Sequence, residues 1–171
     1  RVKKPESIAQ KLVKKGLPFT VEAIMTNLSD VAGVRIICEF IDDIYTIAAM
    51  LAMQDDLKLI KIKDYIKYPK PNGYRSYHMI VEIPVFFSKG KTPMRVEIQI
   101  RTIAMDFWAS LDHELKYKKN IAPEDEEMIA QELLSCADRS AETDTIMQQI
   151  RMKLDSVQED KAKAEIVIQD Q

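Results

Sequence analysis

A basic and aromatic segment, residues 64–78, is the part of this sequence best suited to bind an anionic ligand. It is too polar for a core segment and too aromatic for an ordinary surface loop. The side chains of Lys70, Arg75 and His78 can meet phosphate oxygens, and the ring of Tyr74 can stack on a base. Two prolines and a glycine in the same segment favour an exposed, turn-rich presentation of these groups.

A second segment, residues 95–101, alternates strictly between polar and apolar side chains. The two-residue period of a strand places the polar side chains on one face and the valine and isoleucines on the other. The polar face consists of Arg95, Glu97, Gln99 and Arg101. An acid between two guanidinium groups, beside a basic aromatic loop, indicates a nucleotide and metal site. The open alternative is a solvated sheet face.

A second acid, Asp30, comes directly before a predicted strand. Magnesium usually takes one or two protein carboxylates and completes its shell with phosphate oxygens and water. Asp30 and Glu97, on neighbouring strands, would supply those two carboxylates. A turn or capping role is the alternative for Asp30.

Basic residues gather near the start of the chain and within the first predicted strand. Arg1, Lys3 and Ser7 lie beside a helix start, an arrangement that suits a triphosphate. A solvated helix face is the alternative for the basic residues of this region, and it is the expected explanation for Lys14 and Lys15. Arg35 interrupts an apolar strand, so its charge needs a partner or a ligand, and its planar group can stack on a base.

Several classes of protein are excluded by absent patterns. His78 lacks the context of a serine or cysteine nucleophile, and the chain has neither a GxxxxGK[ST] loop nor a GxGxxG fingerprint. Cys38 and Cys136 lack metal-ligand spacing, which argues against zinc. A buried free thiol at Cys38 fits a reducing compartment, and no apolar run reaches the roughly 18 residues of a membrane span. We therefore expect a cytoplasmic protein without a membrane partner.

The 171 residues favour a single domain with a charge asymmetry along the chain. Residues 123–171 contain 13 acidic and 5 basic side chains, whereas the preceding part contains 14 acidic and 20 basic ones. A basic body with an acidic tail suggests that the body binds anionic ligands.

Hydrophobic periodicity predicts the elements that must position these residues. Helices are expected over 5–15, 20–28, 42–53 and 102–118, strands over 31–41, 57–63, 76–87 and 95–101, and one long helix or two over 123–165. Gly16, with Pro18, is expected to end the first helix, and Thr20 to cap the second. In the helix over 102–118, the stripe Ile103, Phe107, Leu111 and Leu115 is expected to face the core. The order predicts an α+β (mixed α/β) fold, a sheet flanked by helices with a C-terminal helical extension.

Five segments, in order, resemble the synthetase domain of the RelA/SpoT family. They are residues 1–8, 30–35, 63–66, 69–76 and 96–102. Residues 104–114 are similar to the variant found in small stand-alone alarmone synthetases. The resemblance covers residues 1–118 and implies a nucleotidyltransferase-like fold with a mixed sheet.

The implied activity is that of a GTP diphosphokinase, which moves pyrophosphate from ATP to the 3′-hydroxyl of GDP or GTP. Asp30 and Glu97 would hold Mg²⁺, and Glu97 would activate the hydroxyl. The resemblance assigns ATP to Arg1, Lys3, Ser7, Lys11 and Arg35. It assigns GDP or GTP to Lys63, Lys70, Asn72, Tyr74, His78, Gln99 and Ala109.

The chain is expected to have two parts. Residues 1–120 are expected to form the synthetase domain, and residues 121–171 an extension that assembles a homo-oligomer, a tetramer by resemblance. The rival function is a non-catalytic nucleotide- or RNA-binding sensor on the same fold. A sensor has no need of both carboxylates, and no feature specifically supports an RNA partner.

Overall fold

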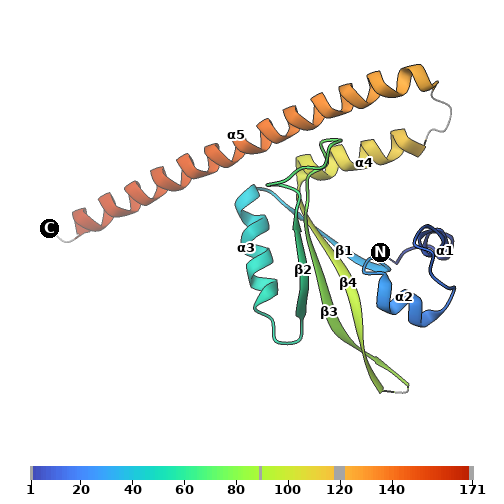
Figure 1. Ribbon diagram of the computed structural model, residues 1–171. Coiled ribbons are helices and arrows are strands. Elements are labelled where there is room, and N and C mark those ends of the chain that lie inside the picture. The colour runs from blue at the N-terminus through green and yellow to red at the C-terminus, as the bar shows by residue number, and fades with distance from the viewer. Residues whose placement is uncertain (1, 89, 118–121, 170–171) are drawn as a thin grey trace.

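The computed structural model describes residues 2–88, 90–117 and 122–169, and shows one sheet with helices at its sides and end (Figure 1). The elements in chain order are α1 (Pro5–Lys14), α2 (Val21–Asn27), β1 (Ala32–Cys38), α3 (Ile41–Ala52), β2 (Lys58–Asp64), β3 (Tyr77–Phe87), β4 (Gly90–Thr102), α4 (Ile103–Tyr117) and α5 (Pro123–Gln169). The predicted mixed α+β fold is confirmed, and the C-terminal segment is one long helix.

The sheet has the strand order β1-β4-β3-β2 and is mixed. β1 runs parallel to β4, while the β3–β4 and β2–β3 pairs are antiparallel. The register places Arg35 opposite Gln99, Gln99 opposite His78, and His78 opposite Lys63. Four polar residues from four strands therefore form one row across the sheet.

The opposite face of the sheet carries the main hydrophobic core. Met79, Val81 and Ile100 are fully buried there, together with Ile44 and Ala48 of α3. This is the expected result of strand alternation, because the apolar neighbours of His78 and Gln99 point to the face opposite those side chains. Packing on this face therefore holds the strands that carry the polar row in place.

The N-terminal helices form a small separate cluster beside β1. Leu12 of α1 packs with Ala23 and Leu28 around α2. Gly16, with φ of 64°, ends α1 in the left-handed conformation, and the Thr20 side chain accepts a hydrogen bond from Ala23 N–H at the start of α2. The end of α1 and the start of α2 were both predicted from these residue types.

The predicted core stripe of α4 is wrong. Ile103, Phe107 and Leu111 are 61%, 63% and 44% exposed, whereas Met105 and Trp108 are buried. The helix follows β4 without a connecting loop, so the end of that strand sets its rotation. The sequence of this helix contains two sets of apolar residues at helical spacing. The set with Met105 and Trp108 is buried, because it lies on the face that meets β4 and α5.

Helix α5 lies along α4 and passes the start of α3 (Figure 1). Trp108 Nε1 donates to Leu133 O at 2.8 Å, Gln148 exchanges two hydrogen bonds with Asp42, and Arg151 pairs with Asp43. Residues 133–151 are therefore docked on the body. Apolar side chains remain 44–57% exposed along the same helix, at Ile146, Ile150, Leu154 and Val157.

We predict that Thr102→Val lowers the free energy of unfolding by about 2 kcal/mol. Thr102 is fully buried; its hydroxyl accepts from Met105 N–H at 3.1 Å, capping α4, and donates to Asp144 Oδ2 at 2.6 Å. The valine removes the cap and leaves the buried carboxyl without that donor. Urea denaturation measures the change. Thr145→Val, at an exposed hydroxyl of α5, is the control, and equal losses in the two variants would contradict the role of Thr102.

Candidate active site

Two adjoining cavities open on the polar face of the sheet. The edge cavity, about 500 Å³, lies along β1 and is lined by Lys3, Gly33 and Val34 besides shared residues. The main cleft, about 890 Å³, extends over β2, β3 and β4 to α4. Both cavities are lined by Asp30, Arg35, Glu97 and Gln99. Two ligands bound side by side would therefore meet at these four residues.

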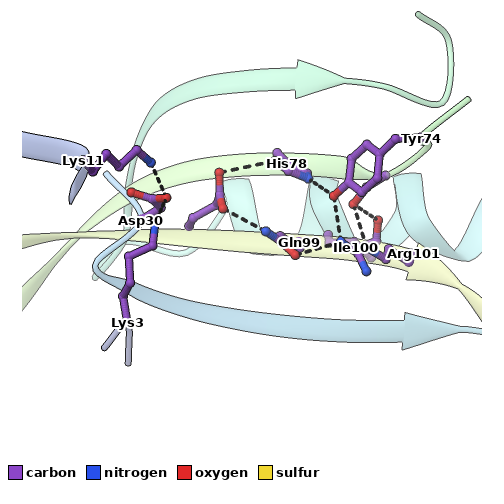
Figure 2. Close-up of polar contacts among 10 residues, drawn as sticks. Lys3, Lys11, Asp30, Tyr74, His78, Gln99, Ile100 and Arg101 are labelled. Atoms are coloured by element: carbon purple, nitrogen blue, oxygen red, sulfur yellow. Dashed lines mark hydrogen bonds and ion pairs between the residues drawn. The ribbon is translucent and has the colours of Figure 1, made fainter. Parts of the chain in front are cut away.

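A closed ring of hydrogen bonds links Glu97 with four other side chains, those of His78, Tyr74, Arg101 and Gln99, which Figure 2 labels. His78 Nδ1 lies 3.3 Å from Glu97 Oε1, and His78 Nε2 lies 2.9 Å from Tyr74 Oη. Arg101 Nη2 donates to Tyr74 Oη at 2.7 Å and to Gln99 Oε1 at 3.0 Å. Gln99 Nε2 closes the ring by donating to Glu97 Oε2 at 2.8 Å. If the His78 imidazole donates from Nδ1 to Glu97 and accepts a hydrogen bond from the Tyr74 hydroxyl at Nε2, every member of the ring is satisfied.

Arg101 is the central donor of this ring and is only 4% exposed. Besides its two ring contacts, it donates to Ser76 Oγ and pairs with Asp106 at 3.0 Å. Asp106 also pairs with Arg35 at 3.0 Å, which supplies the partner that the charge in β1 requires. Because the buried Arg101 guanidinium bonds to Ser76, Asp106 and its two ring partners, it holds these side chains in one arrangement.

Glu97 is a partly buried acid that remains ionised. Burial alone raises the pKa of its carboxyl, but the hydrogen bonds from His78 and Gln99 outweigh that effect and hold the pKa below its ordinary value. Glu97 is therefore available as a proton acceptor. Because it is partly buried, the proton must come from a group in direct contact with it.

Asp30 pairs with two ammonium groups at once. Lys3 Nζ and Lys11 Nζ both lie 2.5 Å from its Oδ2 (Figure 2). Burial raises the pKa of this carboxyl, but the bonds from Lys11 and Lys3 more than offset it, so the pKa is lowered. Its other oxygen, Oδ1, is buried without a hydrogen-bond partner among the described residues. Asp30 and Glu97 line the same two cavities, and an ionised carboxylate oxygen that receives no hydrogen bond suits a cation ligand.

No group of three or more His, Cys, Asp or Glu side chains in the described ranges could hold a metal alone. The Asp30 and Glu97 pair suits a cation that takes most of its ligands from phosphate and water, as Mg²⁺ does.

Aromatic rings line the main cleft beside the Glu97 ring. Tyr65 contacts both Tyr74 and His78 edge to face, with centroids 6.0 and 5.2 Å apart. Lys70 Nζ lies 4.4 Å from the Tyr74 centroid and 4.8 Å from that of Tyr65, and the Arg101 guanidinium lies 5.2 Å from Tyr74. The cluster offers ring faces for a base and cations for its phosphates.

The structure brings together most of the predicted site residues. Lys63, Lys70, Asn72, Tyr74, His78, Gln99 and Ala109 all line the main cleft with Lys11, while Lys3 lines the edge cavity and Arg35 both. Ser7 lines neither cavity; it lies in the first turn of α1. Arg1 lies outside the described residues.

The expectation that Arg75 meets phosphate is wrong for this arrangement. Its guanidinium turns away from the cleft and bonds to α5, at Ala137 O and Asp138. Several cleft residues were not assigned a role from the sequence, although Arg101 lay on the alternating face of β4 and Tyr65 in the basic and aromatic segment. The missed lining residues are Tyr65, Arg101, Ser110, Asp112, His113 and Glu114.

A family model for the region found in RelA / SpoT proteins matches residues 1–122. The chain belongs to the RelA/SpoT family. The resemblance carried by the five sequence segments is thereby confirmed, and the matched range contains all four residues shared by the two cavities.

Similar proteins of this family include two GTP pyrophosphokinases of Bacillus subtilis (strain 168). YwaC is 53% identical over 120 residues, which are 70% of this chain and 57% of that protein. YjbM is 42% identical over 118 residues, 69% of this chain and 54% of that protein. The chain thus spans little more than half the length of these relatives.

Solved structures agree with the fold. Small alarmone synthetase 1 from Bacillus subtilis bound to its product pppGpp superposes with a TM-score of 0.82 at 38% identity, covering 91% of this chain and 77% of that one. Small alarmone synthetase 2 from Bacillus subtilis gives 0.79 at 45% identity, covering 90% and 78%. In the part of the chain that is described, no helix is both long and apolar enough to span a membrane.

We predict that the difference in unfolding free energy between the native protein and Asp30→Asn depends on pH. Because the pKa of Asp30 is lowered in the folded state, its stabilisation is complete above the ordinary carboxyl pKa. It is lost as the pH falls through the lower folded value, below about 4. Acid denaturation curves of both proteins measure this. In a Lys11→Met background the pH-dependent part should shrink, and an unchanged difference would contradict the pairing.

Proposed function

We propose that this protein transfers pyrophosphate from ATP to the ribose 3′-hydroxyl of GDP or GTP, giving ppGpp or pppGpp and AMP. The observation that carries the proposal is an ionised Glu97, held in a closed ring, at the junction of two cavities. The family, and the GTP pyrophosphokinases that the chain resembles, support the same reaction class.

We assign ATP to the edge cavity and the guanine nucleotide to the main cleft. Lys3 and Arg35 line the edge cavity, and Lys11 reaches Asp30 from the adjoining main cleft, so all three supply positive charge beside Asp30, as a triphosphate requires. In the main cleft, Tyr74 offers a ring for guanine, Ala109 a small side chain beside it, and the groups expected at the acceptor's ribose and phosphates are Lys63, Lys70, Asn72, His78 and Gln99. Arg1 and Ser7 remain predicted ATP contacts.

The chemistry needs an attacking oxygen, a leaving group and a proton acceptor. The 3′-hydroxyl oxygen forms a bond to the β-phosphorus of ATP, and the bond from that phosphorus to the oxygen bridging to the α-phosphate breaks, so AMP leaves. The hydroxyl proton passes to the Glu97 carboxylate. His78 and Gln99 hold both carboxylate oxygens at fixed angles, which orients Glu97 toward the shared part of the two cavities.

Positive charge around the junction supports this transfer. Developing negative charge on phosphate oxygens is stabilised by fixed cations, which supply most of the catalysis in reactions of this type. Asp30 and Glu97 are the residues that would hold Mg²⁺, with Asp30 Oδ1 as the oxygen still lacking a donor. When bound, Mg²⁺ would neutralise phosphate charge and orient the transferred group.

We predict that Glu97→Gln reduces the rate of ppGpp formation at least about 1,000-fold, equivalent to roughly 4 kcal/mol of barrier. The amide matches the carboxylate in shape but cannot accept the proton. Incubation with ATP, GDP and Mg²⁺, followed by nucleotide chromatography, measures ppGpp and AMP. Gln54→Glu, on an exposed residue after α3, is the control.

Two results of that assay bear on the proposal. Near-normal turnover in Glu97→Gln would show that Glu97 is not the proton acceptor. A native protein that binds both nucleotides without forming AMP would favour the alternative of a non-catalytic sensor.

We also propose a homo-oligomer, a tetramer by family resemblance, in which residues 121–171 act as the assembly element beside a synthetase domain of residues 1–120. Support comes from the apolar residues left exposed on α5 and from the exposed Ile103, Phe107 and Leu111 of α4. Such residues on two adjacent helices suit burial against another copy. A cytoplasmic location stays a prediction.

We predict that Ile150→Glu with Leu154→Glu dissociates this oligomer, because charges replace apolar contacts that would be desolvated in it. Light scattering at micromolar concentration reports the mass. The native protein should exceed the monomer mass of 19.7 kDa, and the double variant should approach it. Ser156→Glu, at an already polar exposed position of α5, is the control. A native protein that is monomeric would contradict the assembly.

A further inference from the structure

The loop between β2 and β3, residues 65–76, is pressed against helix α5; we call it the acceptor loop. Gly73 N–H donates to Lys70 O at 2.8 Å and Lys70 N–H to Tyr74 O at 3.1 Å, which makes a tight turn. Gly73 has φ of 84°, and a Cβ there would lie 2.5 Å from the Ala137 Cβ. Only glycine fits both this conformation and this approach. The turn that carries Tyr74 thus rests directly on α5.

Arg75 fastens the same turn to α5 from the other side. Its Nη1 donates to Gly73 O at 3.3 Å and to Ala137 O at 3.1 Å, and its Nη2 donates to Asp138 Oδ1 at 3.2 Å. The Arg75 side chain is 19% exposed, whereas that of Asp138 is 64% exposed. The bonds to the two carbonyls are therefore the stronger part of the clamp, because a solvated ion pair contributes little.

Tyr74 lies between these two clamped residues and is held a second time at its hydroxyl. The hydroxyl bonds to His78 Nε2 and accepts from Arg101 Nη2, within the ring that ends on Glu97. The backbone of Tyr74 is thus positioned by α5 and its ring by the active site. A shift of the loop on α5 displaces the ring face offered to the base.

The ATP side takes its supports from elsewhere. Lys3 and Lys11 pair with Asp30, and Arg35 pairs with Asp106 of α4. Asp106 also pairs with Arg101, so Arg35 is connected to the acceptor loop only indirectly, through Arg101 and Tyr74. A change in the contacts between the acceptor loop and α5 should therefore alter the affinity for the guanine nucleotide more than the affinity for ATP.

We propose that Arg75 is a positioning residue for the acceptor nucleotide: by clamping the acceptor loop to Ala137 of α5, it couples that helix to guanine-nucleotide binding. The inference rests on the proposed function and deepens it. It explains why a basic residue in a phosphate-binding motif turns its guanidinium away from the cleft. It also makes α5, which carries the exposed apolar residues, the element through which assembly or a bound partner can alter acceptor affinity.

The test measures binding of GDP and of a non-hydrolysable ATP analogue to the full chain, and the KM of each substrate. In Arg75→Met, which keeps the length of the side chain but not its donors, we expect the Kd and KM for GDP to rise about tenfold. The values for the ATP analogue and ATP should stay within about twofold. Arg75→Lys, which can still reach one carbonyl, should recover part of the loss.

A variant on α5 separates positioning from direct contact with the ligand. Ala137→Val adds bulk against Gly73 and should weaken GDP selectively, although residue 137 lies under the loop and lines neither cavity. Arg139→Ala, an exposed arginine two residues further along α5, is the matched control and should change neither nucleotide. Thermal melts of each variant identify any loss of folding.

The outcomes are distinct. A loss in Arg75→Met without a loss in folded Ala137→Val would mean that Arg75 meets the ligand itself, which overturns the inference. Equal losses for GDP and the ATP analogue would overturn it as well. If the native protein binds GDP but forms no AMP, the proposed function fails while the selective loss of GDP binding still decides the inference. If it binds neither nucleotide, both fail.

Discussion

The partly buried carboxylate of Glu97 imposes the constraint on which the rest of the site depends. A charge taken out of water must be hydrogen-bonded on every side or it takes up a proton. Here His78 and Gln99 occupy its two oxygens, and Arg101 joins the far ends of both through Gln99 and Tyr74. Moving any one of these five side chains breaks two contacts of the ring. The arrangement therefore has one conformation, which is the property that a proton acceptor in a transfer reaction needs.

The register of the sheet makes that ring geometrically available. Parallel pairing of β1 with β4 brings the segment from Asp30 to Arg35 beside Glu97 and Gln99, and antiparallel pairing of β3 places His78 on the other side. The same alternation directs Met79, Ile98 and Ile100 toward the core that includes α3. A shift of one residue in any strand would exchange the site for the core, so the hydrophobic packing on one face specifies the chemistry on the other.

Local patterns predicted the alternating face of β4, the end of α1 at Gly16 and the cap of α2 at Thr20. They also placed Asp30 immediately before a strand, and the family resemblance supplied the residues that line both cavities. The core face of α4 was not predictable from its period, because Ile103-Phe107-Leu111 and Met105-Trp108 are both helical stripes. Arg75 was misassigned for a related reason. Its chemistry is that of a phosphate ligand, and only the carbonyl of Ala137, 62 residues later, shows where its donors go.

The sequence by itself determined the family, the order of elements and the chemical character of the site, because periodicity, turn residues and charge are properties of neighbouring positions in the chain. Only the tertiary structure decided which face of α4 is buried, where α5 docks and how Glu97, Tyr74, His78, Gln99 and Arg101 close into a ring. Those outcomes depend on contacts between segments far apart in sequence. The same apolar and charged groups could be buried in more than one way, and no local pattern in the sequence distinguishes these alternatives.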